Sequence, residues 1–176
     1  MNILVVNGSP RKNGNSELLC KEFVRGAREA GNHVDEVYLR EKTVMPCRAC
    51  YACFSTGKCV QKDDMAGILE KTQNTDILVW ATPTYFLTMS GQMKTMIDRL
   101  LPKWSELGGK DAYIIVTGHD GKAGLSRNAE DLRAVLTNLG CRVKSVIWGE
   151  RVWKAGEVRG TAAMEEAYNA GLGIRP

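Results

Sequence analysis

The chain has 176 residues, a length that suits one domain, and 44% of them are hydrophobic, which is ordinary for a folded core. Its 24 basic and 20 acidic residues leave a net charge of only +4, and the sparse aromatic residues do not alternate with basic ones, which argues against nucleic-acid binding. No apolar run approaches the roughly 20 residues of a membrane span or resembles a secretory signal. We therefore expect a cytoplasmic protein without nucleic-acid or membrane partners. Its six cysteines are then expected to be ligands or free thiols rather than disulfides.

Apolar runs typical of buried strands alternate with helical patterns along the chain. The expected strands are, in chain order, Ile3–Asn7, Val34–Leu39, Ile77–Ala81, Ala112–Thr117 and Val143–Trp148. The expected helices cover 16–30, a short segment capped by Asp63 or Asp64, 93–101, a segment around 132–139, and 161–168. Parallel neighbours need crossover connections, so this alternation predicts an α/β fold with a doubly wound parallel sheet. Because no repeat or linker interrupts the pattern, residues 1–176 are expected to form a single domain.

The loop after the first strand, residues 8–16, is rich in groups that suit a phosphate. Ligands of such sheets bind beyond the carboxyl ends of the strands. The loop combines two glycines with short polar side chains and a guanidinium, at Ser9, Arg11, Asn15 and Ser16, and the following helix offers unpaired N–H groups. It lacks both the GxGxxG fingerprint and the lysine of a P-loop. A plain strand–helix turn is the alternative, but such a turn would not need so many phosphate-suited groups.

Two further loops follow later strands of the predicted sheet. Pro83, Thr84, Tyr85 and Phe86 follow the third expected strand and offer N–H groups and flat apolar surface for a ring, although a proline turn with two core aromatics is the alternative. Thr117, Gly118 and His119 close the fourth strand, at the same edge of the predicted sheet. A histidine in a loop is more often solvated than catalytic, so we expect no catalytic role for His119. Asp98 follows Lys94 at helical spacing, so the two residues are expected to form a surface pair.

The loop at 46–60 contains the most unusual pattern of the chain, Cys47-x2-Cys50-x2-Cys53-x5-Cys59. Four thiolates so close in sequence can ligate one cluster or metal ion. A structural zinc site usually separates its Cys-x2-Cys pairs further, and disulfides between cysteines three residues apart are strained. A redox-active Cys-x2-Cys pair and inert cysteines remain open alternatives. Cys20 and Cys141, in contrast, are predicted to be small core residues.

The first loop resembles the Gly-Ser-Pro-Arg…Asn-Ser loop of the NADPH-dependent FMN reductase and iron–sulfur flavoprotein branch of the flavodoxin-like superfamily. Pro-x-Tyr before Ser-Gly-x-x-Lys…Asp-Arg is similar to the ring-binding segment of the same family. The resemblance implies a flavodoxin-like three-layer sandwich, with a five-stranded parallel sheet in the order 2-1-3-4-5 and helices on both faces. It also implies FMN, with phosphate contacts at Ser9, Arg11, Asn15 and Ser16 and ring contacts at Pro83, Thr84, Tyr85, Phe86, Thr117, Gly118 and His119. The cysteine spacing resembles the iron–sulfur flavoprotein motif, which implies that Cys47, Cys50, Cys53 and Cys59 bind a [4Fe–4S] cluster.

These features lead to three hypotheses for the function. The first is an FMN-dependent oxidoreductase that uses NAD(P)H as co-substrate and reduces a small-molecule electron acceptor such as a quinone, a free flavin or a metal complex. The second is an iron–sulfur flavoprotein that carries electrons from ferredoxin through the cluster to FMN, and the third is a zinc-stabilised interaction domain. The resemblance also implies a homodimer or homotetramer. After Gly149 the sequence contains no motif that resembles the family.

Overall fold

The computed structural model describes residues 1–175, which form one sheet with helices on both of its faces. The strands are β1 (Asn2–Asn7), β2 (His33–Tyr38), β3 (Ile77–Pro83), β4 (Asp111–Thr117) and β5 (Arg142–Gly149). The α-helices are α1 (Asn15–Glu29), α2 (Ala52–Thr56), α3 (Met65–Gln73), α4 (Gly91–Asp98), α5 (Lys122–Asn138) and α6 (Ala162–Leu172). Two short 3-10 helices, η1 (Leu39–Glu41) and η2 (Leu101–Glu106), complete the list. Each expected strand is confirmed to within two residues.

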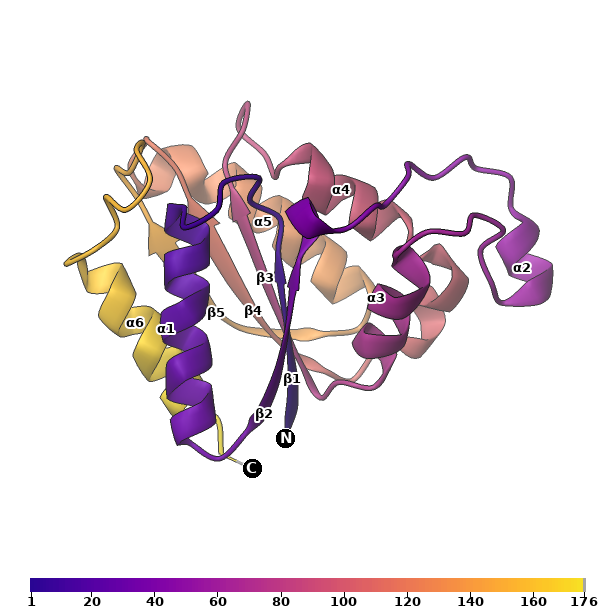
Figure 1. Cartoon of the computed structure of the whole chain (residues 1–176), viewed down its shortest axis with the longest axis horizontal. Helices are drawn as coiled ribbons and strands as arrows, with labels where there is room; N and C mark the ends of the chain where they lie inside the picture. Colours follow the sequence, from indigo (N-terminus) through magenta and orange to yellow (C-terminus); the bar gives the residue numbers. More distant parts are fainter. Residues whose placement is uncertain (176) are drawn as a thin grey trace.

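The sheet is parallel throughout and has the order β2-β1-β3-β4-β5, which confirms the flavodoxin-like architecture. The strand at one edge, β2, is the one whose sequence is polar enough for an edge. Helices α1 and α6 lie side by side on one face, and α3, α4 and α5 cover the other (Figure 1). Winding reverses between β1 and β3, so the loops that follow these strands flank the crevice where ligands bind in such folds.

Alternating side chains of the central strands fill two separate cores. In β1, Ile3 and Val5 pack toward α1 and α6, whereas Leu4 and Val6 pack toward α3, α4 and α5. Successive side chains of a strand point to opposite faces, so a run that is apolar at every position can be buried on both sides. The central strands are therefore held by apolar contacts on both faces, which gives their carboxyl ends a fixed frame.

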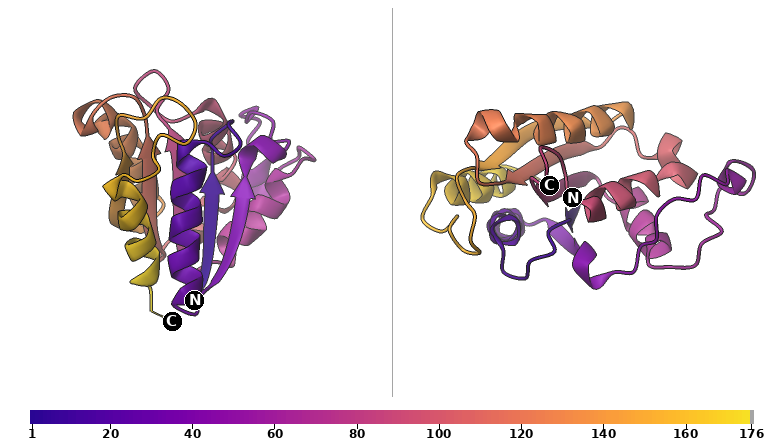
Figure 2. Two further views of the ribbon diagram at one scale, coloured as in Figure 1. Left: turned by 60° about the vertical axis from the view of Figure 1, so that its left-hand side comes forward. Right: turned by 90° about the horizontal axis from the view of Figure 1, so that it is seen from above.

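Three elements differ from the expected ones. The helix expected over 93–101 ends at Asp98 and the chain continues as η2, because Pro102 removes a backbone N–H and disfavours α-helical geometry at the preceding residue. The last helix extends to Leu172. The short helix α2 lies inside the cysteine-rich loop, and this segment projects away from the sheet (Figures 1 and 2). Among residues 1–175, no helix is both long and apolar enough to cross a membrane.

Candidate functional site

A cavity of about 410 Å³ lies at the carboxyl ends of the strands. Four chain segments line it: the first loop, the loop after β3, the loop after β4 and a tail segment after β5. The structure brings every residue predicted to hold the cofactor into its lining, namely Ser9, Arg11, Asn15, Ser16, Pro83, Thr84, Tyr85, Phe86, Thr117, Gly118 and His119. The volume falls in the range of roughly 300–1,000 Å³ typical of cofactor and ligand pockets.

The first loop presents the start of α1 to this cavity. Gly14 occupies the N-cap position, and no side chain caps the helix within the described residues, so the N–H groups of its first turn are left for a ligand. Ser9 is 3% exposed, and its hydroxyl oxygen accepts the Arg11 N–H at 3.3 Å. Ser16 and Thr117 join their hydroxyls at 2.7 Å, which ties the first turn of α1 to the end of β4. This arrangement is suited to an anion such as phosphate.

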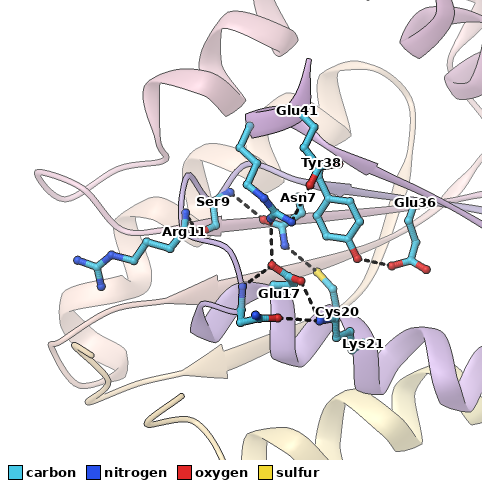
Figure 3. A network of polar contacts seen from close by, with 11 residues as sticks. Asn7, Ser9, Arg11, Glu17, Cys20, Lys21, Glu36, Tyr38 and Glu41 are labelled. Atoms are coloured by element: carbon cyan, nitrogen blue, oxygen red, sulfur yellow. Dashed lines mark hydrogen bonds and ion pairs between the residues drawn. The ribbon is translucent and has the colours of Figure 1, made fainter. Parts of the chain in front are cut away.

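Glu17 belongs to a network of polar contacts next to the first loop (Figure 3). Its buried carboxylate accepts the Asn13 N–H at 2.7 Å and forms ion pairs with Lys21 at 2.8 Å and Arg40 at 3.0 Å. Asn13 has a left-handed backbone (φ 55°), which this hydrogen bond helps to hold. Burial disfavours the Glu17 charge, but the contacts with Lys21, Asn13 and Arg40 outweigh burial and lower the pKa of Glu17. The loop is therefore shaped in advance of any ligand.

In the loop after β3, backbone N–H groups expected to be free are hydrogen-bonded, and the aromatic residues are exposed. The Thr84 N–H donates to the Thr117 carbonyl at 2.7 Å, and the Tyr85 N–H donates to the Thr88 carbonyl at 2.9 Å, so neither is free for a ring. The buried Asn128 of α5 donates to the Thr84 hydroxyl at 2.9 Å and so holds the loop against the sheet. Phe86 has a left-handed backbone and a fully exposed side chain. The expected flat wall is thus an open lip of the cavity, and the alternative of two core aromatics is wrong, because Tyr85 is 39% exposed and Phe86 is fully exposed.

A tail loop, residues 150–158, forms the fourth wall, which the sequence analysis did not identify. Val152 and Trp153 line the cavity, and the Trp153 ring meets the His119 ring edge-on with centroids 5.6 Å apart. The Arg11 Nη1 donates to the Trp153 carbonyl at 2.7 Å, and the Asn15 Nδ2 donates to the Lys154 carbonyl at 2.9 Å. Two side chains expected to contact a phosphate therefore hold the tail loop in this structure. No local sequence signal marks such contacts between residues about 140 positions apart.

The four cysteines of the 46–60 loop lie around one small pocket that is separate from the cavity. Cys47, Cys50, Cys53 and Cys59 all line it and all are free thiols. Within residues 1–175, however, no three His, Cys, Asp or Glu side chains gather closely enough to hold a single metal ion. Ala49 and Tyr51, on either side of Cys50, both have left-handed backbones, which are costly for residues with a Cβ. The expected ligand set thus shares one pocket without converging on one point.

Arg99 is a buried residue in the lining of this cysteine pocket. Its guanidinium donates to the Asp63 carboxylate through Nη1 at 2.8 Å and Nη2 at 3.0 Å, and both side chains are 1% exposed. Its Nε is buried and makes no hydrogen bond within the part of the chain that the structure describes. Burial disfavours the Arg99 charge, but Asp63 and then Cys59 favour it, and the net effect raises the pKa of Arg99. A buried N–H donor is therefore available beside the cysteines.

Two further expectations are confirmed: Cys20 and Cys141 lie in the core, and Lys94 and Asp98 form a surface pair. Cys20 is 1% exposed and Cys141 is 5% exposed, so both are core residues. Burial raises the pKa of both thiols, which keeps them protonated and unreactive. Lys94 and Asp98 form an ion pair on the exposed face of α4.

Comparison with known proteins shows that the chain matches a protein family. The family model described as NADPH-dependent FMN reductase matches residues 1–149, which include the first three walls of the cavity and the cysteine loop. An iron–sulfur flavoprotein of Archaeoglobus fulgidus is 35% identical over 102 residues, covering 58% of this chain and 46% of the relative. The chain spans about half the length of this and three further iron–sulfur flavoproteins that it matches.

Two other proteins are similar over more of their length. A putative NAD(P)H-dependent FMN-containing oxidoreductase of Bacillus subtilis, YwqN, is 31% identical over 133 residues, covering 68% of each chain. An FMN-dependent NADH-azoreductase of Bacillus anthracis, solved in complex with FMN, superposes with a TM-score of 0.74 over 97% of this chain and 98% of that one, at 15% identity. At this identity the superposition shows a shared fold.

Proposed function

Because the chain belongs to the NADPH-dependent FMN reductase family, we propose that it binds FMN in the cavity and acts as an NAD(P)H-dependent oxidoreductase. The observation that supports this most is that all residues expected to contact FMN line one cavity at the strand ends. The start of α1, which no side chain caps, suits the phosphate, and the loops after β3 and β4 suit the ring. The acceptor is proposed to be a quinone, a flavin or a similar small molecule.

The chain's own residues contribute position and solvent exclusion to this reaction. Bound FMN supplies the ring that accepts and passes on a hydride. The first loop holds the phosphate through N–H groups and through the hydroxyls of Ser9 and Ser16, which keep hydrogen-bonding capacity beyond their internal bonds. Pro83, Thr84 and Gly118 bound the ring, and the exposed Phe86 leaves one side of the cavity open for NAD(P)H and then the acceptor. No proton transfer by His119 is required.

Replacement of Ser9 by aspartate tests the phosphate site. Ser9→Asp keeps an oxygen that can accept the Arg11 N–H but places a negative charge beside the proposed phosphate. Like charges about 4 Å apart repel by roughly 4 kcal/mol in protein surroundings, so FMN affinity should fall by about 100-fold even after screening. Riboflavin, which has no phosphate, should bind as it does to the wild type. Fluorescence titration of the apoprotein with each flavin measures both affinities.

The matched control is Ser126→Asp, which adds the same charge on the exposed side of α5, outside the cavity. It should leave both affinities unchanged, and urea unfolding should show that both variants are folded. Equal loss of FMN and riboflavin binding in Ser9→Asp would contradict a phosphate at the first loop. Steady oxidation of NADH or NADPH by the FMN-loaded protein, with a quinone as acceptor, then tests the activity itself.

A second candidate function, an iron–sulfur flavoprotein electron carrier, is favoured by the cysteine pocket. We propose that Cys47, Cys50, Cys53 and Cys59 hold a [4Fe–4S] cluster. A cluster of this kind takes one thiolate at each of four irons, so its ligands need not converge on one point as they would around a single ion. The buried and unpaired Nε of Arg99 is the kind of donor that hydrogen-bonds to cluster or thiolate sulfur. Reduction only by ferredoxin, and not by NAD(P)H, would support this function over the first.

Replacing one cysteine of the pocket tests the cluster. Protein purified without air should contain about four irons and about four sulfides per chain, and Cys53→Ala should lose most of both, because the cluster loses one of its ligands. Cys141→Ala is the control, since Cys141 is a buried thiol outside the pocket, and its iron content should match the wild type. Wild-type protein without iron after anaerobic purification would contradict the cluster.

We further propose that residues 1–176 act as a single flavodoxin-like domain within a homodimer or homotetramer. Phe86 is fully exposed and Leu87 is 57% exposed at the open lip of the cavity. Adjacent apolar side chains exposed beside a pocket are typical of a surface that a partner covers. A second subunit over this lip would exclude water from the ring.

A further inference from the structure

We propose that Asn15 is a positioning residue that holds the tail loop, residues 150–158, as a wall of the cavity, so that Trp153 contacts the bound flavin. The inference rests on the proposed function for the identity of the ligand. It concerns a segment that lies beyond the residues matched by the family, 1–149. It also assigns Asn15 a role different from the phosphate contact that the sequence predicts.

Asn15 uses both polar atoms of its side chain to bind the tail loop. It is 8% exposed, and its Nδ2 donates to the Lys154 carbonyl at 2.9 Å. Its Oδ1 accepts the N–H groups of Gly156 at 3.0 Å and Val158 at 3.2 Å. Both polar atoms are therefore occupied before any ligand arrives, and three hydrogen bonds from one buried amide fix both ends of a turn. Turning this amide toward a phosphate would leave those backbone groups unpaired.

Other contacts shape the tail loop into a rigid wall. Val152 and Val158 are buried in the core beneath α1 and α6, and Glu157 accepts the N–H groups of Trp153 at 2.6 Å and Lys154 at 2.9 Å. Figures 1 and 2 show this loop near the first loop, at the N-terminal end of α1. The Trp153 side chain stays 64% exposed at the cavity, against His119, where a ligand ring can cover it.

Two flavins that differ only in the phosphate separate this role from a phosphate contact. In Asn15→Ala, the affinities for FMN and riboflavin should both fall by about tenfold, because the wall that faces the ring is loosened. Asn15→Asp keeps the acceptor for Gly156 and Val158 but replaces the donor to the Lys154 carbonyl by an oxygen, so riboflavin affinity should recover only in part while FMN affinity stays low through charge repulsion. Trp153→Ala should weaken both flavins by about tenfold. Trp104→Ala, an exposed tryptophan outside the cavity, should change neither.

A measurement without ligand tests whether Asn15 holds the tail loop in place. Hydrogen exchange of the Gly156 and Val158 amides should be at least about tenfold faster in Asn15→Ala than in the wild type, while the core strands stay protected. Unchanged exchange at both amides would overturn the proposal, as would loss of FMN binding with riboflavin binding intact in Asn15→Ala. If wild-type protein binds neither flavin, the proposed function fails, and the exchange rates still decide whether Asn15 holds the tail loop.

Discussion

Replacing Arg99 by leucine should lower the free energy of unfolding by about 3–5 kcal/mol, the usual cost of removing one partner of a buried ion pair. The substitution leaves the Asp63 carboxylate in a site where its side chain is 1% exposed, with no cation to pair with. It also removes the donor to the Met45 carbonyl, which Arg99 contacts at 2.6 Å, and so releases the start of the cysteine segment. Urea unfolding at neutral pH measures the change.

Lys94→Leu provides the matched control for Arg99→Leu. Lys94 lies in α4, which ends directly before Arg99, and its ion pair with Asp98 is about half exposed. Exposed pairs of this spacing contribute only about 0.3–0.5 kcal/mol, so this variant should stay close to the wild type. The double variant Arg99→Leu/Asp63→Leu should regain part of the loss, because it leaves no uncompensated charge. An Arg99→Leu protein within about 1 kcal/mol of the wild type would contradict a structural ion pair.

The buried ion pair between Arg99 and Asp63 also predicts a loss of stability in acid. Burial disfavours the Asp63 charge, but Arg99 and the N–H groups of Met45 and Met65 outweigh burial and lower the pKa of Asp63. A carboxylate with a lowered folded-state pKa stabilises the protein above its unfolded-state pKa, and this contribution is lost as the pH falls toward the folded-state pKa. The wild-type protein should therefore lose more stability between neutral and acidic pH than the double variant does.

The second large effect is expected where α1 and α6 cross. A Cβ added at Gly171 would lie 2.1 Å from the Phe23 carbonyl oxygen, and one added at Gly26 would lie 2.1 Å from the Tyr168 carbonyl oxygen. Neither oxygen belongs to a flexible side chain, so the two helices would have to separate. Gly171→Ala should therefore destabilise the protein by about 3 kcal/mol, in the upper range for overpacked sites. Thermal and urea unfolding measure the loss.

Gly67→Ala separates this clash from the general effect of adding a methyl group to a helical glycine. Gly67 is exposed in α3, and a Cβ there meets nothing within 4 Å. Alanine is a better helix former than glycine, so Gly67→Ala should stabilise the protein by about 0.5–1 kcal/mol. Stabilisation by Gly171→Ala as well would show that the helices do not approach as closely as described.

The central strands and the first loop could be predicted because their signals are local. A strand buried on both faces is a continuous apolar run, as in Ile3–Val6, and the loop that follows must combine glycines with short polar groups to approach an anion. The predicted members of the cavity also share one simple property: each lies at or just beyond the carboxyl end of a parallel strand.

Contacts between distant parts of the chain could not be predicted in this way. Arg99 directly follows the surface pair Lys94–Asp98 in the sequence, yet it is buried with Asp63, which lies 36 residues earlier. Asn15 is predicted to be a phosphate contact from its position in the first loop. Its hydrogen-bond partners in the tail loop lie 139 to 143 residues away, so no local pattern indicates them. The last helix extends to Leu172, beyond the predicted 161–168, and its final turn contains Gly171, which has low helix propensity but packs closely against α1.

The proposed oxidoreductase function depends on FMN binding in the cavity at the strand ends. The most direct test of this binding is the absorption spectrum of the protein after incubation with FMN without air and removal of free flavin by gel filtration. We expect two resolved flavin bands that stay with the protein at about one FMN per chain, and loss of those bands in Ser9→Asp at the same concentrations. A wild-type protein that shows no flavin bands after this treatment would show that the cavity does not bind FMN.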